Sequence, residues 1–282
     1  MHDIELPGIP ERLWAEAAEA PARLLILDYD GTLAPFHVER MRAETPRRTR
    51  EWLTACAQLP DSETFIASGR PVDELLALLG PQPVRFIGEH GWEWFAPGFG
   101  RQARPVPPPV LVALDLAARE AVALAGPERV ERKRASVALH TRGQDAGWAR
   151  RVTDRVEVLW RETMARVDPR HTGLRLDLIA EGLELRSELW NKGRVVRDLL
   201  RAAPDGALIV CLGDGATDED AFRTLAGRGH TYGVHVGKDA IPTWANARLD
   251  DPEAVGHFLE RWWRAVTGET GEVEGRAGGA RG

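Results

Sequence analysis

Apolar and polar residues alternate in blocks along this chain, and the blocks predict an alternation of strands and helices. Five short runs are largely apolar and end at glycine, aspartate or serine, namely residues 23–28, 64–68, 84–88, 207–214 and 231–237. Such runs are typical of parallel strands that are covered on both faces. The segments with helical spacing of apolar residues are 46–59, 71–80, 191–203, 218–227 and 253–266. The pattern predicts an open α/β fold with a parallel sheet.

The middle of the chain has a different pattern, in which strands pair locally. A proline-rich connector, a helix, two strands of alternating polarity, a long helix and a hairpin are predicted near residues 104–110, 110–125, 128–143, 145–167 and 173–187. The hairpin is expected to turn at Glu181-Gly182. The resulting αββαββ order suits a small layer with one open sheet face.

We therefore predict a core domain of residues 1–101 and 187–267, interrupted by an inserted domain of residues 102–186. The remaining stretch, residues 268–282, is rich in glycine and charge. Such a composition predicts a disordered tail.

Composition places the chain among ordinary globular proteins. Its 282 residues are 43% hydrophobic and 28% charged, enough to bury a full core. The net charge of -6 arises from dispersed residues, so no basic surface for nucleic acid is expected. Neither a signal pattern nor an apolar run of about 20 residues stands out, which predicts a cytoplasmic protein without a membrane partner. Cys56 and Cys211 fit reduced thiols in a core.

The first candidate for chemistry is the segment LLILDYDGTL, where a strand ends in Asp28 and Asp30. Two carboxylates beside a buried strand end are costly unless a cation or hydrogen bonds compensate their charge. Residues two apart can point to the same side of a strand end, and Gly31 allows a sharp turn beside them. The alternative is that Asp28 caps a loop and Asp30-Gly31 forms an ordinary turn.

A second and a third segment offer groups that bind anions. Ser68-Gly69-Arg70 follows a strand and precedes a helix, so it presents a hydroxyl, an amide and a helix N-terminus, although Ser-Gly is also a common turn. Lys192 opens another helix and is one of only three lysines among 37 basic residues. A compact ammonium suits a place beside carboxylates and a phosphoryl oxygen, whereas a solvated lysine in a first helical turn is the alternative.

A fourth segment, GDGATDED, follows the apolar run that ends near residue 212. Helix capping accounts well for Asp218, Glu219 and Asp220 but less well for Asp214. Carboxylates from two neighbouring strand ends make a hard oxygen site suited to Mg²⁺. Together with a lysine and donors of hydrogen bonds, they are the parts needed for phosphoryl transfer.

These four segments, in this order and spacing, resemble the motifs of the haloacid dehalogenase superfamily of phosphohydrolases, which have a Rossmann-like core. Residues 88–95, 131–142 and 233–262 further resemble its trehalose-6-phosphate phosphatase family, so the similarity extends to about Trp263. The resemblance implies a Mg²⁺-dependent hydrolase of trehalose biosynthesis that acts on a small sugar phosphate. We expect a monomer or weak homo-oligomer.

The resemblance also implies a role for each matching residue. Asp28 would be the nucleophile that forms an aspartyl-phosphate, and Asp30 the general acid and base. The phosphate-binding residues would be Ser68, Gly69, Arg70 and the catalytic Lys192. The Mg²⁺ ligands would be Asp28, the backbone carbonyl of Asp30 and Asp214, with Asp218 as a further ligand or as a partner that orients one.

The inserted segment resembles the C2B-type cap of this branch, which would close over the sugar and exclude water. The sugar-binding candidates are His90 and Glu93 from the core and Glu131, Lys133, His140 and Glu184 from the insert. Alternating charges near residue 132 also fit a solvated strand face, and a single histidine is often structural. The family commonly has an aspartate after the position of Asp214, where this chain has Gly215.

Two other functions remain open. The same chemistry could act on sucrose phosphate or on glucosyl- or mannosyl-3-phosphoglycerate, since only the insert would distinguish these substrates. A non-catalytic regulatory subunit is disfavoured because Asp28, Asp30, Lys192 and Asp214 are all retained.

Overall fold

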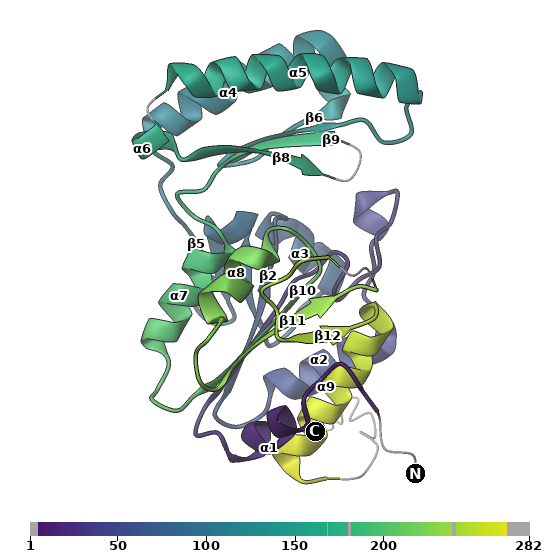
Figure 1. Ribbon diagram of the computed structural model, residues 1–282, viewed down its shortest axis with the longest axis vertical. Helices are drawn as coiled ribbons and strands as arrows, with labels where there is room; N and C mark the ends of the chain where they lie inside the picture. The colour runs from purple at the N-terminus through teal and green to yellow at the C-terminus, as the bar shows by residue number, and fades with distance from the viewer. Residues whose placement is uncertain (1–4, 168, 180–181, 239–240, 270–282) are drawn as a thin grey trace, which may run out of the picture.

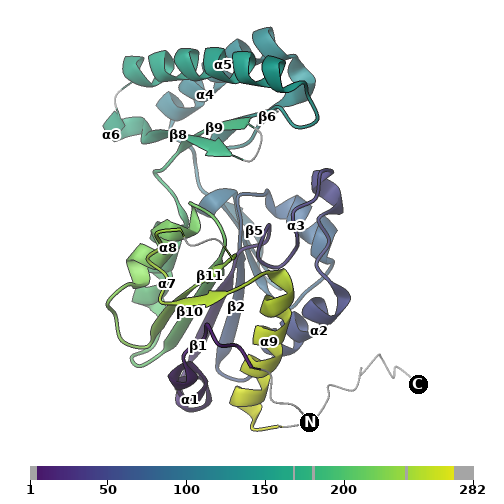
Figure 2. The ribbon, with the colours of Figure 1, turned by 45° about the vertical axis from the view of Figure 1, so that its right-hand side comes forward.

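The computed structural model describes residues 5–167, 169–179, 182–238 and 241–269. Two layered units of unequal size lie one above the other, and the chain crosses between them before helix α4 and again before helix α7 (Figures 1 and 2). The larger unit is built on an eight-stranded sheet and the smaller on a four-stranded sheet. We call these the core layer and the upper layer.

The core sheet has the order β12-β11-β10-β1-β2-β3-β4-β5. Its strands are β1 Arg23–Leu27, β2 Ser62–Ala67, β3 Arg85–Gly88, β4 Glu93–Ala96, β5 Gly100–Ala103, β10 Leu208–Gly213, β11 Thr231–Val236 and β12 Ala247–Leu249. The strands from β12 to β3 pair in parallel, whereas β4 and β5 are antiparallel. Leu27 at the end of β1 is in register with Leu212 and Ile66, so the carboxyl ends of three strands meet.

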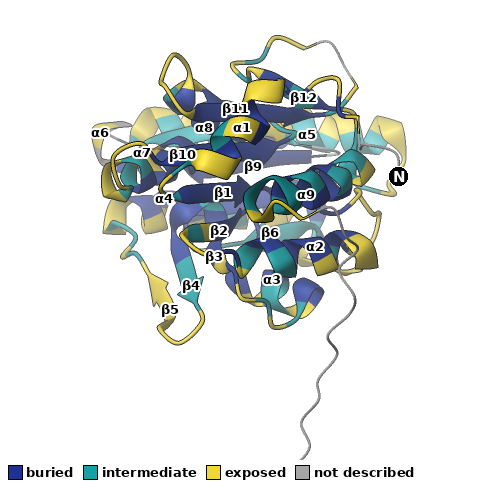
Figure 3. Ribbon diagram, turned by 90° about the horizontal axis from the view of Figure 1, so that it is seen from below, coloured by how far each residue is buried: buried dark blue, intermediate teal, exposed yellow. Residues whose placement is uncertain are grey.

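Helices cover both faces of the core sheet. They are α1 Glu11–Glu19, α2 Arg47–Ala57, α3 Val72–Leu79, α7 Lys192–Ala202, α8 Asp218–Leu225 and α9 Pro252–Thr267, with 3₁₀ turns at Arg40–Arg42 and Glu89–Gly91. Leu25 of β1 packs in a cluster with α1, α2, α3 and α9, while Ile26 packs on the opposite face with α7 and α8. Figure 3 shows the buried strands between these two groups of helices. Burial on both faces explains the unbroken apolar runs.

The upper layer has two long helices on one face of an antiparallel sheet of order β6-β7-β9-β8. Its elements are α4 Pro108–Ala125, a 3₁₀ turn Pro127–Arg129, β6 Val130–Arg132, β7 Ser136–His140, α5 Ala146–Arg166, α6 Pro169–Thr172, β8 Leu174–Ile179 and β9 Gly182–Ser187. Val137 and Leu139 pack with Trp160 of α5 in a separate apolar cluster. Alternation along β7 therefore turns Ala138 and His140 toward the core layer.

The predicted α/β fold with a parallel sheet and an αββαββ segment is confirmed. Sequence patterns missed α1, the three-residue β12 and the short antiparallel strands β4 and β5. Residues 102 and 103 pair in the core sheet as the end of β5, and the division into two domains stays a prediction. The expected hairpin forms, but Gly182, predicted in its turn, is the first residue of β9 and pairs with Ile179; Glu181 lies outside the described residues. Most of the predicted disordered tail, residues 270–282, also lies outside them.

In the described part of the chain, no helix is both long and apolar enough to cross a membrane.

Candidate active site

Asp28 and Asp30 stand where β1 ends and the chain turns. The Asp28 N–H donates to the Leu212 carbonyl of β10 at 2.9 Å, which holds the residue between two strands. Beyond it, the Gly31 N–H donates to the Ala34 carbonyl at 2.8 Å and closes a tight loop. Gly31 has a φ of +76°, and a side chain there would overlap the Asp214 carboxylate. The turn is therefore tightly packed against a second acidic residue, unlike an ordinary surface turn.

Lys192 brings the third and fourth segments together with the first. It begins α7, is 3% exposed, and its Nζ lies 2.8 Å from Asp28 Oδ1 and 2.7 Å from Asp218 Oδ1. Burial would lower the pKa of this ammonium, but Asp218 and Asp28 together raise it above its ordinary value. The observed burial excludes the alternative of a solvated lysine.

The carboxylates of Asp28, Asp214 and Asp218 each place an oxygen within 4.8 Å of the others. Burial raises the pKa of Asp28 well above its ordinary value, with Lys192 opposing and the other two acids adding to the rise. Burial and the neighbouring Asp218 raise the pKa of Asp214 to about 7. Three carboxylates thus lie together while the ammonium of Lys192 contacts two of them, and hard oxygen donors with an excess of negative charge fit Mg²⁺. Asp218 also caps locally, because its Oδ2 accepts the Gly215 N–H at 3.2 Å.

Arg70 binds Asp30 through both oxygens, with its Nε 2.6 Å from Oδ2 and its Nη2 2.6 Å from Oδ1. The sequence predicted that Arg70 would bind phosphate, and its guanidinium also contacts Asp30, the predicted acid and base. Ser68 is buried, and its Oγ accepts the Arg70 N–H at 3.2 Å. Gly69 permits a close approach of His90, because a Cβ at position 69 would lie 2.7 Å from that ring.

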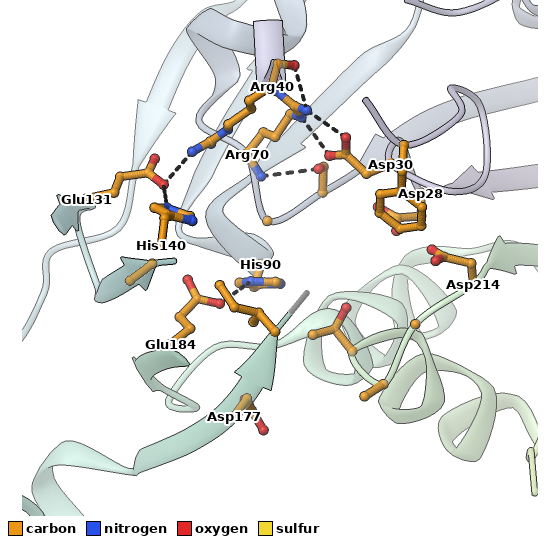
Figure 4. A pocket seen from close by; sticks show the side chains of 18 of the residues that line it. Asp28, Asp30, Arg40, Arg70, His90, Glu131, His140, Asp177, Glu184 and Asp214 are labelled. Atoms are coloured by element: carbon orange, nitrogen blue, oxygen red, sulfur yellow. Dashed lines mark hydrogen bonds and ion pairs between the residues drawn. The ribbon is translucent and has the colours of Figure 1, made fainter. Parts of the chain in front are cut away.

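A cavity of about 670 Å³ lies between the two layers at the carboxyl ends of β1 and β10. Figure 4 shows side chains from both layers pointing into it. The predicted site residues that line it are Asp28, Asp30, Ser68, Gly69, Arg70, His90, Glu131, Lys133, His140, Glu184, Lys192 and Asp214. Asp218 lies beneath it against Lys192. The fold has therefore gathered segments that are distant in sequence.

Glu93 lies outside this cavity. Its Oε2 accepts the Val72 N–H at 3.1 Å at the start of α3, and its Oε1 lies 3.4 Å from Arg134 of the upper layer. These contacts give it a role in linking the two layers.

Glu184 is the buried acid of the upper layer. Its Oε1 accepts the Ser136 hydroxyl at 2.7 Å and lies 3.3 Å from Lys133 Nζ. Burial would raise the pKa of Glu184, but Lys133 above all, aided by the Ser136 hydroxyl, holds it at about 2. Glu184 is therefore an anion at neutral pH, and its other oxygen lies 3.9 Å from His90 Nε2.

His90 reaches the cavity from an unusual backbone position, with a φ of +58°. Burial lowers the pKa of His90 to about 3, so the ring is uncharged at neutral pH. Among the described residues its Nδ1 has no hydrogen-bond partner. A buried polar atom without a partner beside a cavity is suited to a ligand hydroxyl.

Glu131 is held by two cations and a histidine ring. It pairs with Arg40, lies 3.1 Å from His140 Nε2 and lies 3.9 Å from Lys133 Nζ. Burial would raise the pKa of Glu131, but His140, Lys133 and Arg40 hold it well below its usual range. The charged residues near position 132 are therefore partly buried and paired with one another. This arrangement differs from that of a solvated strand face.

Three further residues, Arg40, Arg142 and Asp177, line this cavity, and no sequence pattern had indicated them. Arg40 follows the first motif in a stretch without clear periodicity, and its partner Glu131 belongs to the other layer. The position of Asp177 on β8 follows only from the pairing register, in which it is opposite Glu184.

Comparison with known proteins gives matches along nearly the whole chain. The family model described as trehalose-phosphatase matches residues 26–253. A probable trehalose-phosphate phosphatase C of Arabidopsis thaliana is 30% identical over 271 residues, covering 89% of this chain and 81% of the relative. A bifunctional trehalose-6-phosphate synthase/phosphatase of Thermoproteus tenax is 30% identical over 254 residues, covering 89% of this chain but 33% of the relative.

Solved structures show the same fold. The C-terminal domain of trehalose-6-phosphate phosphatase from C. albicans superposes with a TM-score of 0.76 at 22% identity, covering 95% of this chain and all of that domain. A haloacid dehalogenase-like hydrolase from Bacteroides thetaiotaomicron superposes with a TM-score of 0.57 at 18% identity, covering 85% of this chain and 99% of the other.

Proposed function

Since this chain belongs to the trehalose-phosphatase family, we propose that it hydrolyses trehalose 6-phosphate to trehalose and phosphate. The observation that carries the proposal is the buried Asp28–Lys192–Asp218 arrangement at the floor of a cavity whose roof carries polar side chains. A nucleophilic carboxylate, a cation and a separate acid are the groups that phosphoryl transfer through a covalent intermediate requires.

In the first step, an Asp28 oxygen attacks phosphorus while the bond between phosphorus and the sugar oxygen breaks. The leaving oxygen takes a proton from Asp30, and trehalose departs from an aspartyl-phosphate. In the second step, a water molecule attacks the phosphorus of this intermediate and gives its proton to Asp30. Phosphate leaves, and both carboxyl groups return to their starting states.

The surrounding groups hold the phosphoryl oxygens. Lys192 supplies a fixed positive charge beside Asp28, while the Ser68 hydroxyl and the Gly69 amide are donors at the start of α3. Mg²⁺ would be held by Asp28, the Asp30 backbone carbonyl, Asp214 and Asp218, and would supply the charge that lets an anionic phosphate approach an anionic carboxylate.

The upper layer acts as the cap in this proposal, with residues 102–186 as the inserted domain. Its Glu131, Lys133, His140 and Glu184 would bind sugar hydroxyls, together with His90 from the core. Ionised carboxylates form strong hydrogen bonds with hydroxyl groups, and removing such a partner costs about 1.5–3 kcal/mol. The cap would also exclude water from the first step, so that the sugar phosphate and not bulk solvent meets Asp28.

Phosphate release from a panel of substrates with Mg²⁺ tests the proposal. The panel contains trehalose 6-phosphate, sucrose 6-phosphate, glucose 6-phosphate, glucosyl-3-phosphoglycerate and p-nitrophenyl phosphate. We expect a preference for trehalose 6-phosphate, loss of all activity in Asp28→Asn, and unchanged activity in Asp198→Asn, which alters a partly exposed residue of α7.

A second variant tests the role of the upper layer. Glu184→Gln should lower kcat/KM for trehalose 6-phosphate by about 10- to 100-fold, while p-nitrophenyl phosphate, which lacks the sugar, should be affected far less. Preference for another member of the panel would support the proposed phosphatase mechanism but would contradict trehalose 6-phosphate as the substrate. Absence of phosphate release from every member would favour a non-catalytic regulatory subunit.

A further inference from the structure

The loop of residues 37–43 in the core layer is bound by the upper layer at two places. Arg142 Nη1 donates to the carbonyl oxygens of His37 at 2.8 Å and Val38 at 3.0 Å. Two residues further along, the Arg40 side chain pairs with Glu131 of β6. A movement of the upper layer therefore acts directly on this loop.

The same loop holds the arginine that binds Asp30. The Arg40 carbonyl oxygen accepts from Arg70 Nη2 at 3.0 Å, and Arg40 Nη2 lies 2.9 Å from Glu74 Oε2. Glu74 Oε2 in turn lies 3.2 Å from Arg70 Nη1. Figure 4 shows Arg40 between Glu131 on one side and the Arg70–Asp30 pair on the other.

This bonding matters because Asp30 must carry a proton in the first step of the proposed reaction. An arginine that binds both oxygens leaves neither oxygen free to hold a proton toward the leaving group. At least one of the two Arg70 bonds must therefore open. The groups that can retain Arg70 at that moment are Glu74 and the Arg40 carbonyl oxygen, and both depend on Arg40.

We propose that Arg40 is a positioning residue that makes the hydrogen bonding of Asp30 depend on the upper layer. The inference rests on the proposed function, because it concerns the proton that Asp30 gives to a sugar. Glu131 of the upper layer binds the Arg40 side chain. Arg40 in turn positions the two groups that bind Arg70, namely the Glu74 carboxylate and the Arg40 carbonyl oxygen. A substrate that engages Glu131 thereby changes the bonding of Asp30, whereas one that lacks a sugar does not.

The test compares leaving groups that differ in their need for a proton. Single-turnover release of trehalose from trehalose 6-phosphate requires an acid, whereas release of p-nitrophenolate from p-nitrophenyl phosphate does not. Arg40→Ala should slow release of trehalose by about 10- to 100-fold, as expected for impaired general acid catalysis, and change release of p-nitrophenolate by less than about threefold. Arg40→Lys keeps the charge and should restore part of the rate.

Two further variants control for structural damage. Arg42 lies in the same 3₁₀ turn, is exposed and pairs with Glu39, so Arg42→Ala should leave both rates unchanged. Glu74→Gln should show the same leaving-group difference as Arg40→Ala, and the double variant should be little slower than either single variant, because both act through Arg70.

Equal slowing with both substrates, or slower trehalose release that Arg40→Lys does not improve, would overturn the inference. A rise in KM without a change in the single-turnover rate would overturn it too, since Arg40 would then serve only binding. Failure of the wild type to hydrolyse trehalose 6-phosphate would contradict the proposed substrate instead. The comparison would then use glucose 6-phosphate, whose leaving group also needs a proton.

Discussion

Lys192 Nζ lies 2.8 Å from Asp28 and 2.7 Å from Asp218, so one buried ammonium joins two residues that follow the neighbouring strands β1 and β10. Asp214, whose carboxylate belongs to the same cluster, has no comparable contact with the ammonium, and its pKa is raised to about 7 by burial and by Asp218. The site is therefore organised around a single cation, and its stability and its activity depend on the same residue.

Replacement of that cation should destabilise the protein strongly. Lys192→Met would leave two buried carboxylates without their partner, a change that typically costs about 3–5 kcal/mol. We expect urea unfolding in the absence of metal to show this loss, and phosphate release to fall at least 100-fold. Lys238→Met, which alters an exposed lysine, is the matched control. A loss below about 1 kcal/mol would indicate that the carboxylates are already protonated in the fold.

Mg²⁺ should stabilise the folded protein. A ligand that binds only the native state adds about 2.7 kcal/mol at a concentration 100 times its Kd, so MgCl₂ should raise the Tm and EDTA should reverse the effect. Asp214→Asn should abolish most of this increase. Asp220→Asn, a change at a half-buried acid of the same segment, should keep it. An equal increase in both variants would contradict the assignment of Asp214 as a ligand.

Glu89 predicts a pH dependence of stability that is separate from the acidic cluster. Burial, with a smaller contribution from Glu93, raises the pKa of Glu89 from 4.5 to about 7, and its Oε2 has no hydrogen-bond partner among the described residues. A carboxyl group whose pKa is raised on folding favours the native state below its unfolded pKa of 4.5. That contribution is lost as the pH rises through 7.

Glu89→Gln should therefore match the wild type near pH 4.5 and become more stable than it as the pH rises to 8. At about 1.4 kcal/mol per pKa unit, the difference at pH 8 is expected to approach about 3 kcal/mol. Urea unfolding in EDTA across this range would measure it. A difference that stays constant with pH would show that Glu89 titrates normally.

Replacement of Gly215 by aspartate is expected to increase the affinity for Mg²⁺. A Cβ at this position would lie 3.7 Å from Asp218 Oδ2, an ordinary contact, so the backbone has room for a side chain. Gly215→Asp would add a carboxylate beside the cluster, and we expect the Mg²⁺ Kd to fall by about tenfold while the metal-free protein loses stability. Isothermal titration calorimetry would measure the affinity. Gly215→Asn has the same size without the charge, and an equal effect there would contradict the electrostatic explanation.

The convergence of the four motifs could be predicted from the sequence because parallel strands align their carboxyl ends. Asp28 and Asp214 each follow a buried apolar run, and the register of β1 with β10 places them side by side. Lys192 could be predicted for a different reason, since lysine is rare in a chain that otherwise uses arginine.

The partners of long polar side chains could not be predicted in the same way. Arg70 follows a strand end as expected, yet its guanidinium extends to Asp30, a choice that depends on Glu74 and on the loop above it. Glu93 was expected to bind the sugar from the family resemblance alone, and the sequence did not indicate that its carboxylate would accept the Val72 N–H at the start of α3. Strands β4, β5 and β12 were missed because short or exposed strands lack the apolar run that identifies the others.

The position of β1 at the middle of the core sheet has a consequence for synthesis of the chain. Arg23 of β1 is in register with Ser62 of β2, which follows soon after, and with Leu208 of β10, which follows the whole upper layer. Until β10 emerges from the ribosome, one edge of β1 remains unpaired, and Asp28 lacks the carbonyl of Leu212 that holds its backbone. All four strands of the upper sheet lie between residues 130 and 187, so that sheet can form while the core sheet is still open. In the nascent chain the upper sheet can therefore be complete before the core sheet. The unpaired edge of β1 is the part of an incomplete chain that is most prone to aggregation.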